Sequence, residues 1–479
     1  MHNDNFAFAT LRGALGRPDA VAFGGTAPVA YQRYADLVVH FAHRMREFGV
    51  DRNSTVGLAV KSPVVACVAV TAVALLGSRW LSHFHDAPAY VPRCTHVFAG
   101  MGESGIGWFE FTKSWFEAPH AGVADLDEFA GNESGGDLWM IAHSSGTTGR
   151  AKYMPISYET AWRRISGNPE LVDDAPMVLA SLFGPTAYVG IRPRLGNLFA
   201  GGTNVNASSF ARLRAGGVNR VMGSPAQISA LVQRHPEVPL SRIRSCRVTG
   251  AAVTQQFVER ALRYFQEIQV LYGSTEAGVI TLASFTDDKP YDGSTGHPLE
   301  GAGLEVVDDT GTPVPVGTEG TVRIRTEWTV PYYIGAPQLS ATVFQDGWFL
   351  PGDLGYLDAL GALHITGRKG DVLNIAGTKL NAAEVDEVLQ LHPDVVDGYC
   401  FLEKDEHGSD VLAAIVALRS GAPTAGASTI YDLTVKRMGR AKSPKRLYVT
   451  DMVLRNENGK PMRAESAKAA QGLTRIERD

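Results

Sequence analysis

The chain has 479 residues, too many for one ordinary hydrophobic core, so we expect at least two domains. The hydrophobic fraction of 44% and the charged fraction of 20% are ordinary for a soluble globular enzyme, and a formal net charge of −5 gives no overall attraction to nucleic acid or to an anionic membrane. The most apolar stretch, residues 64–77, is shorter than the roughly 20 residues that a membrane-spanning helix needs. Four widely separated cysteines, and an N-terminus without a basic region before an apolar run, predict a reduced, cytoplasmic protein.

The first part of the chain alternates between predicted helices and strands. Residues 31–48 have apolar positions at helical spacing, residues 54–60 form a predicted strand, and residues 63–76 form a predicted buried helix. Further strands are expected near residues 138–142, 178–183, 219–222, 246–249 and 268–272, and further helices over residues 157–166, 207–215, 225–234 and 254–267. Such alternation indicates an α/β fold, in which parallel strands are covered by helices.

The pattern changes twice in the second part of the chain. From about residue 292, β runs joined by Gly/Pro turns, such as GLEVVDDTGTPVPVGTEGTVRIRT at 303–326, predict a β-barrel-like subdomain. The segment GRKGD at 367–371 then separates a large N-terminal domain, residues 1–367, from a small mobile α+β C-terminal domain, residues 368–479. We expect a flexible hinge near residues 368–371.

The segment HSSGTTGRAK at residues 143–152 has the composition of a phosphate-binding loop. It follows an apolar run that predicts a strand, and its glycines let the backbone approach a ligand closely. Successive backbone N–H groups and hydroxyls can bind an anion, while Lys152 supplies a positive charge. The segment is not a nucleotidase P-loop, because Lys152 follows Ala151 and precedes Tyr153 rather than standing between Gly and Ser/Thr. It is not a hydrolase elbow either, since no G-x-S-x-G occurs in the chain.

This segment resembles the phosphate-loop signature of the adenylate-forming superfamily, which includes acyl-CoA synthetases, nonribosomal-peptide adenylation domains and luciferases. Segments similar to four further signatures follow in the family order: LYGSTEAG (271–278), DGWFLPGDLGYLD (346–358), GRKGDVLNIAGTKLNAAEVDEVL (367–389) and LRNENGKPMRAE (454–465). A weaker match, YQRYADLVVHFAHRMREFGV (31–50), precedes them, and together these matches extend over nearly the whole chain. The resemblance departs from the family pattern at Ala151, Tyr153 and Pro351, which removes no charged group.

The resemblance implies an acid–thiol ligase. Such an enzyme uses ATP and Mg²⁺ to convert a carboxylic acid to acyl-AMP with release of pyrophosphate, and then transfers the acyl group to a phosphopantetheine thiol. The acceptor would be CoA or an acyl carrier protein on a separate chain, because no carrier domain is visible after residue 465. Two alternatives remain open: a medium-chain fatty acid ligase with the same mechanism, and a nucleotide-binding relative without catalysis.

The resemblance also assigns roles to individual residues. Thr275 and Arg368 would act on the α-phosphate and at the hinge, Glu276 would hold Mg²⁺, and Asp353 would accept the ribose hydroxyls. Lys460, on the small domain, would stabilise charge in the transition state, and Gly377 would line the thiol tunnel. The remaining ATP-binding residues implied by the resemblance are Ser144, Ser145, Gly146, Thr147, Thr148, Gly149, Lys152, Gly250, Ala251, Ala252, Tyr272, Gly273 and Ser274.

The expected acyl pocket is compact and partly aromatic. Its predicted residues are Phe183, Gly184, Tyr188, Met222, Gly223 and Gly278. Amino-acid-activating relatives carry Phe-Asp where this chain has Phe183-Gly184, so the anchor for an α-ammonium group is missing. We therefore expect an aromatic or other short carboxylic acid rather than an α-amino acid as substrate.

Overall fold

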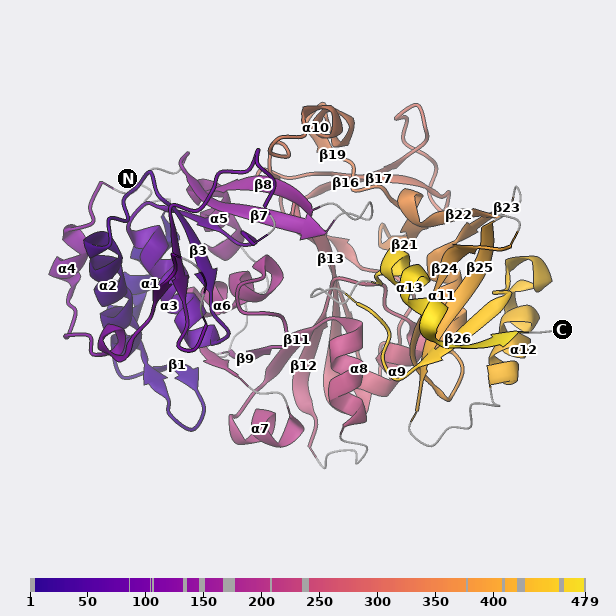
Figure 1. Cartoon of the computed structure of the whole chain (residues 1–479), viewed down its shortest axis with the longest axis horizontal. Helices are drawn as coiled ribbons and strands as arrows, with labels where there is room; N and C mark the ends of the chain where they lie inside the picture. Colours follow the sequence, from indigo (N-terminus) through magenta and orange to yellow (C-terminus); the bar gives the residue numbers. More distant parts are fainter. Residues whose placement is uncertain are drawn as a thin grey trace.

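The computed structural model of the chain describes residues 5–85, 87–103, 105, 107–131, 136–145, 151–166, 177–206, 209–234, 241–375, 378–406, 410–419, 427–455 and 461–477. Within these residues the strands form five sheets, and the helices lie against them (Figure 1). The N-terminal elements lie at one end of the long axis and the C-terminal elements at the other (Figure 1).

A six-stranded sheet carries the predicted phosphate-binding segment at one edge. Its spatial order is β6 (Phe109–Glu110), β5 (His96–Ala99), β3 (Thr55–Ala59), β4 (Arg79–Leu81), β7 (Leu138–Ser145) and β8 (Ala151–Ser157). Neighbouring strands are parallel except β7 and β8, which form an antiparallel hairpin. The predicted segment therefore spans the end of β7 and the start of β8.

A nine-stranded sheet forms the second layer. Its spatial order is β15 (His297–Pro298), β14 (Gly278–Phe285), β13 (Phe265–Ser274), β12 (Ile243–Val248), β11 (Arg220–Gly223), β9 (Val178–Ser181), β10 (Thr203–Val205), β1 (Val21–Gly24) and β2 (Val29–Ala30). The strands from β13 to β1 in this order are parallel. The carboxyl ends of β9, β11, β12 and β13 therefore meet at one edge, where α/β sheets bind ligands.

Helices cover both sheets. They are α1 (Phe6–Leu15), α2 (Tyr31–Glu47), α3 (Pro63–Leu75), α4 (Val123–Asp127), α5 (Tyr158–Ser166), α6 (Tyr188–Ala200), α7 (Phe210–Ala215), α8 (Pro225–Gln233) and α9 (Gln255–Leu262). These helices contribute to two apolar cores, one with α1 to α6 and another with α7 to α9. Helix α3 is apolar all round and almost completely buried, as such a pattern predicts, and Ser62 caps its N-terminus.

The sequence prediction is wrong about the end of α9. The helix was expected to continue to residue 267, but it ends at Leu262, and Phe265 begins β13 opposite Ile243. Phe265 is fully buried, and the burial gained in the sheet outweighs the helical spacing of the preceding residues. The other predicted strands and helices of this part agree with the structure to within a few residues.

The predicted β subdomain follows. It contains β16 (Gly303–Val307), β17 (Gly320–Arg325), β18 (Phe344–Gln345), β19 (Trp348–Phe349), β20 (Asp353–Leu357), β21 (Leu363–Arg368) and α10 (Pro337–Val343). Antiparallel pairing of β20 with β21 places Asp353 directly opposite Arg368. Two residues that are fifteen positions apart therefore become neighbours at the edge of this sheet.

The last part of the chain has its own sheets and its own core. It contains β22 (Val372–Ile375), β23 (Thr378–Asn381), α11 (Ala382–Gln390), β24 (Val395–Lys404), β25 (Asp410–Leu418), α12 (Ala427–Met438), β26 (Arg446–Thr450), α13 (Arg463–Ala469) and β27 (Thr474–Glu477). Buried apolar residues of α11, β24, β25 and β26 pack together. The architecture is thus α/β with a large N-terminal part and a smaller α+β C-terminal part, which confirms the expected fold class.

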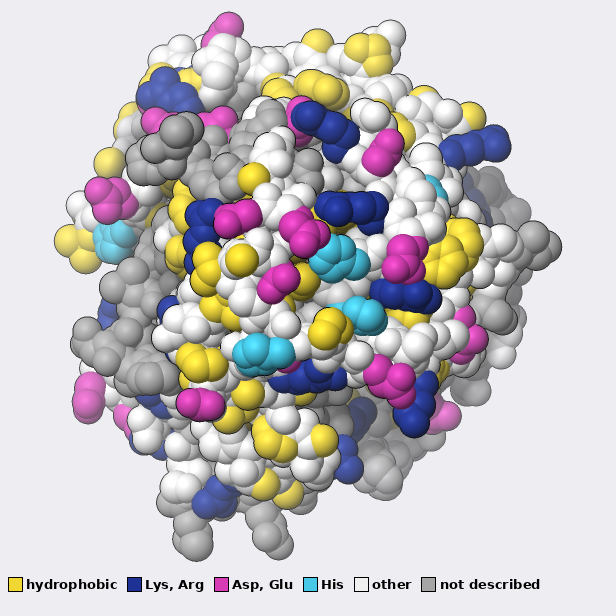
Figure 2. Space-filling model, turned by 90° about the vertical axis from the view of Figure 1, so that its left-hand side faces the viewer, with side chains coloured by type: hydrophobic (Ala, Val, Ile, Leu, Met, Phe, Trp, Pro, Cys, Tyr) yellow, Lys and Arg dark blue, Asp and Glu magenta, His cyan; other side chains and the backbone are white. Residues whose placement is uncertain are grey.

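The face formed by the N-terminal helices carries interspersed positive and negative side chains (Figure 2). Ion pairs such as Arg44–Glu47, with 2.6 Å between nitrogen and oxygen, lie on this part of the molecule. Within the described part of the chain, no helix combines the length and apolarity needed to cross a lipid bilayer.

Candidate active site

The β7–β8 hairpin presents Ser144 and Lys152 side by side. The two residues are direct partners in the antiparallel register, and Ser145 is paired with Ala151. Only the backbone of Ser145 is described, and the predicted ligands Gly146, Thr147, Thr148 and Gly149 lie outside the described residues. The described part of the loop thus brings one hydroxyl and one cation to the same end of a hairpin.

A second hairpin, formed by β13 and β14, presents the predicted catalytic residue Thr275 and the predicted Mg²⁺ ligand Glu276 at its turn. The turn is tight because a Cβ atom on Gly273 would lie 2.1 Å from the carbonyl oxygen of Gly278. Gly278 has a φ of +73°, a conformation that favours glycine. The Ser274 hydroxyl accepts a hydrogen bond of 3.1 Å from the Ala277 backbone N–H and closes the turn.

The two hairpins meet at the Glu276 carboxylate. The Ser144 hydroxyl donates to Glu276 Oε1 over 3.0 Å, and the Tyr333 hydroxyl donates to the same oxygen over 2.8 Å. The Lys152 ammonium nitrogen lies 5.3 Å from the centre of the Tyr333 ring, a cation–π distance. Burial, followed by the nearby Glu276 charge and the hydrogen bond to it, raises the pKa of Tyr333, so its hydroxyl remains a donor at physiological pH.

Tyr333 is a site residue that the sequence did not reveal. It lies in the segment between β17 and α10, outside every signature that we recognised, and a tyrosine in a loop has no distinctive pattern. Its backbone N–H is held by the Ser340 hydroxyl at 2.9 Å, and its side chain is 4% exposed. Only the fold brings this ring to Glu276 and Lys152.

A second polar cluster surrounds Asp353. The Tyr272 hydroxyl donates to Asp353 Oδ2 over 2.6 Å, and Arg368 Nε donates to Asp353 Oδ1 over 2.5 Å. Burial raises the pKa of Tyr272, and the Asp353 charge raises it further. Burial lowers the pKa of Arg368, but its contacts with Asp353 and its proximity to other acidic groups outweigh burial, so the net shift is upward.

The Asp353 cluster joins three predicted site residues from three strands, with Tyr272 on β13, Asp353 on β20 and Arg368 on β21. Arg368 also donates to the carbonyl oxygen of Pro351 over 3.1 Å, so its guanidinium spans the Gly-Asp turn. Arg368 is close enough to Tyr333 to lower the pKa of that phenol against the larger effect of burial. The clusters around Glu276 and Asp353 therefore lie within electrostatic range of each other.

The remaining predicted residues of the large part lie at the carboxyl ends of adjacent parallel strands. Gly250, Ala251 and Ala252 follow β12, Met222 and Gly223 end β11, Phe183 and Gly184 follow β9, and Tyr188 begins α6. Phe183 and Met222 are each 2% exposed and pack in one apolar cluster. The structure thus groups these residues on one edge, next to the Glu276 turn at the end of β13.

A buried arginine, Arg164 on α5, connects two of these groups and was also missed. Its guanidinium contacts the backbone carbonyls of Thr275 and Glu276 and the hydroxyl of Tyr188. The prediction of a helix over residues 157–166 did not reveal this role, because the helix has two arginines and helical arginines mostly lie at the surface.

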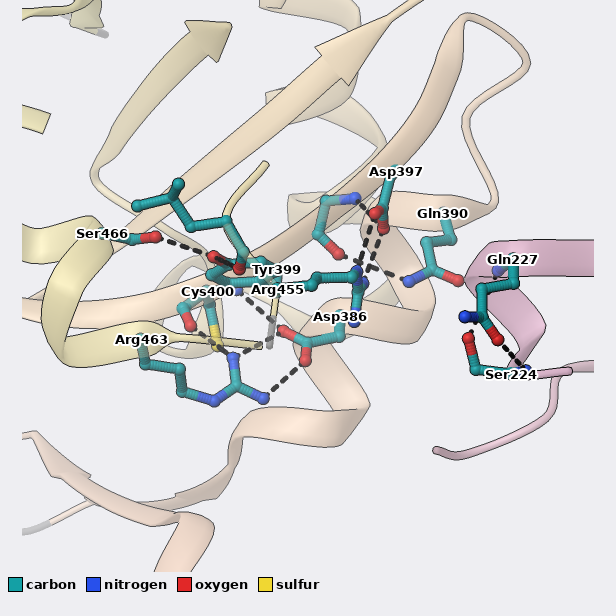
Figure 3. Close-up of polar contacts among 12 residues, drawn as sticks. Ser224, Gln227, Asp386, Gln390, Asp397, Tyr399, Cys400, Arg455, Arg463 and Ser466 are labelled. Carbon is teal, nitrogen blue, oxygen red and sulfur yellow. Dashed lines mark hydrogen bonds and ion pairs between the residues drawn. The ribbon is translucent and has the colours of Figure 1, made fainter. Parts of the chain in front are cut away.

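The C-terminal part contains a partly buried ion-pair cluster beside the segment that resembles the last signature (Figure 3). Arg455 donates to both carboxylate oxygens of Asp397, over 2.7 and 2.6 Å, and Arg463 donates to both of Asp386, over 3.1 and 2.6 Å. Both guanidinium groups lie within 6 Å of the Tyr399 ring centre, at 5.4 and 5.6 Å. Residues 455 and 463 are thereby fixed to α11 and β24. The predicted catalytic Lys460 and the predicted tunnel residue Gly377 lie outside the described residues.

Comparison with known proteins points in the same direction as this geometry. Residues 107–334 match the family model described as AMP-binding enzyme. The chain is 28% identical over 367 residues to an oxalate–CoA ligase of Arabidopsis thaliana, covering 71% of this chain and 70% of that protein. It is 28% identical over 343 residues to an indoleacetate–CoA ligase of Aromatoleum aromaticum, covering 67% of this chain and 65% of that protein.

The fold is also that of solved enzymes. The structure of an anthranilate CoA ligase in complex with anthranoyl-AMP superposes with a TM-score of 0.82 at 20% identity, covering 97% of both chains. The chain thus contains a region that matches AMP-binding enzymes, and it has the fold of adenylate-forming enzymes. This similarity agrees with the geometry, in which hydroxyls, a lysine and a buried carboxylate from separate segments lie at one site.

Proposed function

We propose that the chain is an AMP-forming acid–thiol ligase. In the first reaction a carboxylate oxygen bonds to the α-phosphorus of ATP, and the bond from that phosphorus to the bridging oxygen breaks as pyrophosphate leaves. In the second, the deprotonated sulfur of a phosphopantetheine thiol bonds to the acyl carbon of acyl-AMP, and AMP leaves. The observation that carries the proposal is the contact of Ser144 with Glu276, which joins two hairpins that are 132 residues apart in the chain.

The residues of the first reaction neutralise charge and hold the reactants in line, because a carboxylate approaches a polyanion slowly. Lys152 and the hydroxyls of its loop bind the β- and γ-phosphates, and Thr275 donates to the α-phosphate. Asp353 accepts the ribose hydroxyls while Tyr272 and Arg368 hold its carboxylate. Lys460 of the small domain approaches the α-phosphate when that domain closes.

The Glu276 carboxylate can serve as a ligand for Mg²⁺. Glu276 Oε1 accepts from Ser144 and Tyr333, and no described side chain donates to Oε2, so this oxygen is free for a ligand among the residues that the structure describes. Carboxylate and phosphate oxygens are the ligands that Mg²⁺ takes in nucleotide sites. When bound, Mg²⁺ neutralises phosphate charge, and the role of this chain is to hold the carboxylate in place.

The substrate that we propose is an aromatic or short carboxylic acid. Phe183 and Met222 give the expected pocket an apolar wall, Tyr188 adds a phenol, and Gly184 provides no carboxylate for an α-ammonium group. The relatives named above are ligases of oxalate and indoleacetate, and the superposed structure is a ligase of anthranilate, each a short or aromatic acid. These names support the proposal without fixing the acid.

The second reaction requires the small domain to move. We place the domain boundary between residues 367 and 368, with the hinge at 368–371, and assign Gly377 to the tunnel for the phosphopantetheine arm. CoA and a separate carrier protein are both suitable acceptors. We place the enzyme in the cytoplasm, where its four cysteines stay reduced.

The test is pyrophosphate exchange into ATP with a panel of aryl, short aliphatic, medium-chain and amino acids. We expect exchange with aryl or short acids, followed by thioester formation when CoA or a carrier protein is added. Exchange that is fastest with medium-chain or amino acids would contradict the proposed substrate class. ATP binding without exchange for any acid would contradict the proposed activity.

A further inference from the structure

Arg164 uses every one of its hydrogen-bond donors inside the protein. Nε and Nη2 donate to the carbonyl oxygen of Trp328, over 3.1 and 2.7 Å, and Nη2 also donates to that of Glu276, over 2.7 Å. Nη1 donates to the carbonyl oxygen of Thr275, over 2.9 Å, and to the Tyr188 hydroxyl, over 3.0 Å. These five bonds account for the five N–H groups of a guanidinium. Arg164 is only 5% exposed.

None of these acceptors is a carboxylate. Among the described residues, Arg164 forms no ion pair, whereas its neighbour Arg163 pairs with Glu159 and Glu327 at the surface. A buried cation without a counter-ion is costly, and a neutral side chain would fill the same space at lower cost. The arrangement therefore favours a role for Arg164 at the turn that it contacts.

The contacts are directed at the backbone that orients Thr275 and Glu276. Two consecutive carbonyls are fixed by one rigid, planar group, so both peptide planes of the turn are set. The Glu276 carbonyl is held a second time by the Val330 N–H at 2.9 Å. The site is tightly packed, since a Cβ atom on Gly278 would lie 3.6 Å from Arg164 Nε and 3.2 Å from the Trp328 indole nitrogen.

We propose that Arg164 is a positioning residue that aligns the Thr275 hydroxyl and the Glu276 carboxylate for the nucleotide. Its fifth bond, to the Tyr188 hydroxyl, connects this turn to the expected acyl pocket. The same guanidinium therefore contacts the residue expected to face the acid and the turn expected to face ATP. The inference rests on the proposed function, because it assigns Thr275 and Glu276 to the reaction. Arg164 itself touches no reacting atom in this scheme.

The test compares Arg164→Lys and Arg164→Gln with the wild type and with Arg163→Lys. Lysine keeps the positive charge but loses the planar fork, and glutamine keeps a planar amide but loses the charge. Arg163→Lys is the matched control, because it makes the same replacement one residue away on the exposed side of α5. For each variant we would measure far-UV circular dichroism, urea unfolding, the affinity for ATP with Mg²⁺ and with EDTA, and kcat and KM in pyrophosphate exchange.

We expect folded Arg164 variants to lose about 100-fold in kcat, since a small displacement of a positioning group has this effect. Their KM for the acid should change much less, and most of the Mg²⁺-dependent gain in ATP affinity should disappear. The Arg163→Lys control should match the wild type in each measurement. Addition of methylguanidinium to Arg164→Ala should restore part of kcat, a result that general destabilisation would not produce.

Two kinds of failure can be separated. A folded Arg164→Lys or Arg164→Gln protein with wild-type kcat and Mg²⁺-dependent ATP affinity would overturn the positioning role. If the wild type binds ATP with Mg²⁺ but exchanges no pyrophosphate, the proposed function fails, and the effect of Arg164 on metal-dependent affinity still decides the inference. A wild type that binds no nucleotide would overturn both. If neither substitution folds, the absence of methylguanidinium rescue in Arg164→Ala would count against the role.

Discussion

Replacing Tyr333 by Phe removes one hydroxyl from the Glu276 cluster and leaves the ring in place. Phenylalanine keeps the ring, whose centre lies 5.3 Å from the Lys152 ammonium nitrogen. The substitution therefore removes only the hydrogen bond from the hydroxyl to Glu276. Glu276 and Tyr333 are 6% and 4% exposed, and water therefore cannot easily replace the lost donor. The change tests whether the carboxylate is held by the contacts that the structure describes.

The expected loss follows from the type of bond. A hydrogen bond to a charged group contributes about 1.5–3 kcal/mol, so the free energy of unfolding of Tyr333→Phe should fall by about that amount. If the same contact holds Glu276 in the transition state, kcat/KM for pyrophosphate exchange should fall by about one to two orders of magnitude. Urea unfolding measures the first quantity without any substrate, and exchange with the best acid of the panel measures the second.

A matched control and a double variant sharpen the experiment. Tyr332→Phe removes the hydroxyl of the adjacent tyrosine, which is 49% exposed, and should leave both quantities unchanged. Because Ser144 and Tyr333 donate to the same oxygen of Glu276, Ser144→Ala combined with Tyr333→Phe should not show additive losses of stability. Unfolding of Tyr333→Phe within about 0.5 kcal/mol of wild type, the range of ordinary surface substitutions, would refute this account of the cluster.

Three further predictions concern the reaction and the pH dependence of stability. Lys460→Ala should abolish adenylate formation while ATP affinity and circular dichroism stay close to wild type; undiminished exchange would show that the residue is misassigned. A bulky side chain at Gly377 should spare exchange and slow thioester formation, and equal losses in both reactions would contradict the tunnel assignment. Burial raises the pKa of the Cys67 thiol to about 12, so its stabilising contribution is complete below the unfolded pKa of roughly 8.5 and is lost as pH rises toward 12. Urea unfolding between about pH 9 and 11 should therefore show stability decreasing with pH, and Cys67→Ala should reduce that slope by about 1.4 kcal/mol per pH unit; an unchanged slope would contradict the shift.

Much of the fold could be predicted from local pattern. The apolar run of α3, bounded by Ser62-Pro63 and Gly77, specifies a buried helix by composition alone, and the structure contains it. The end of α9 could not be predicted in this way. Whether residues 263–267 continue a helix or begin a strand depends on the space beside Ile243, which is a property of the assembled sheet.

The residues of the site also differ in whether local sequence could predict them. The segments that contain Ser144, Lys152, Glu276 and Asp353 each have a distinctive composition. In the structure Ser144 contacts Glu276 and is the strand partner of Lys152, and Asp353 contacts Tyr272. The residues that support them carry no such signal. Tyr333 lies in an ordinary loop, and it acts through a contact that depends on the path of the chain between β17 and α10.

The supporting residues suggest how a site built from distant segments can be rigid before any nucleotide binds. The two carboxylates of the site, Glu276 and Asp353, already have donors directed at them: Tyr333 and Ser144 at Glu276, and Tyr272 and Arg368 at Asp353. Burial raises the pKa of both tyrosines, so neither donor is lost near neutral pH. A carboxylate that is already oriented loses little entropy when it binds a metal or a ribose, and binding energy can then act on the reacting atoms. Because Arg368 belongs to the Asp353 cluster and also begins the segment that we assign to the hinge, movement of the small domain should change the ribose contact first.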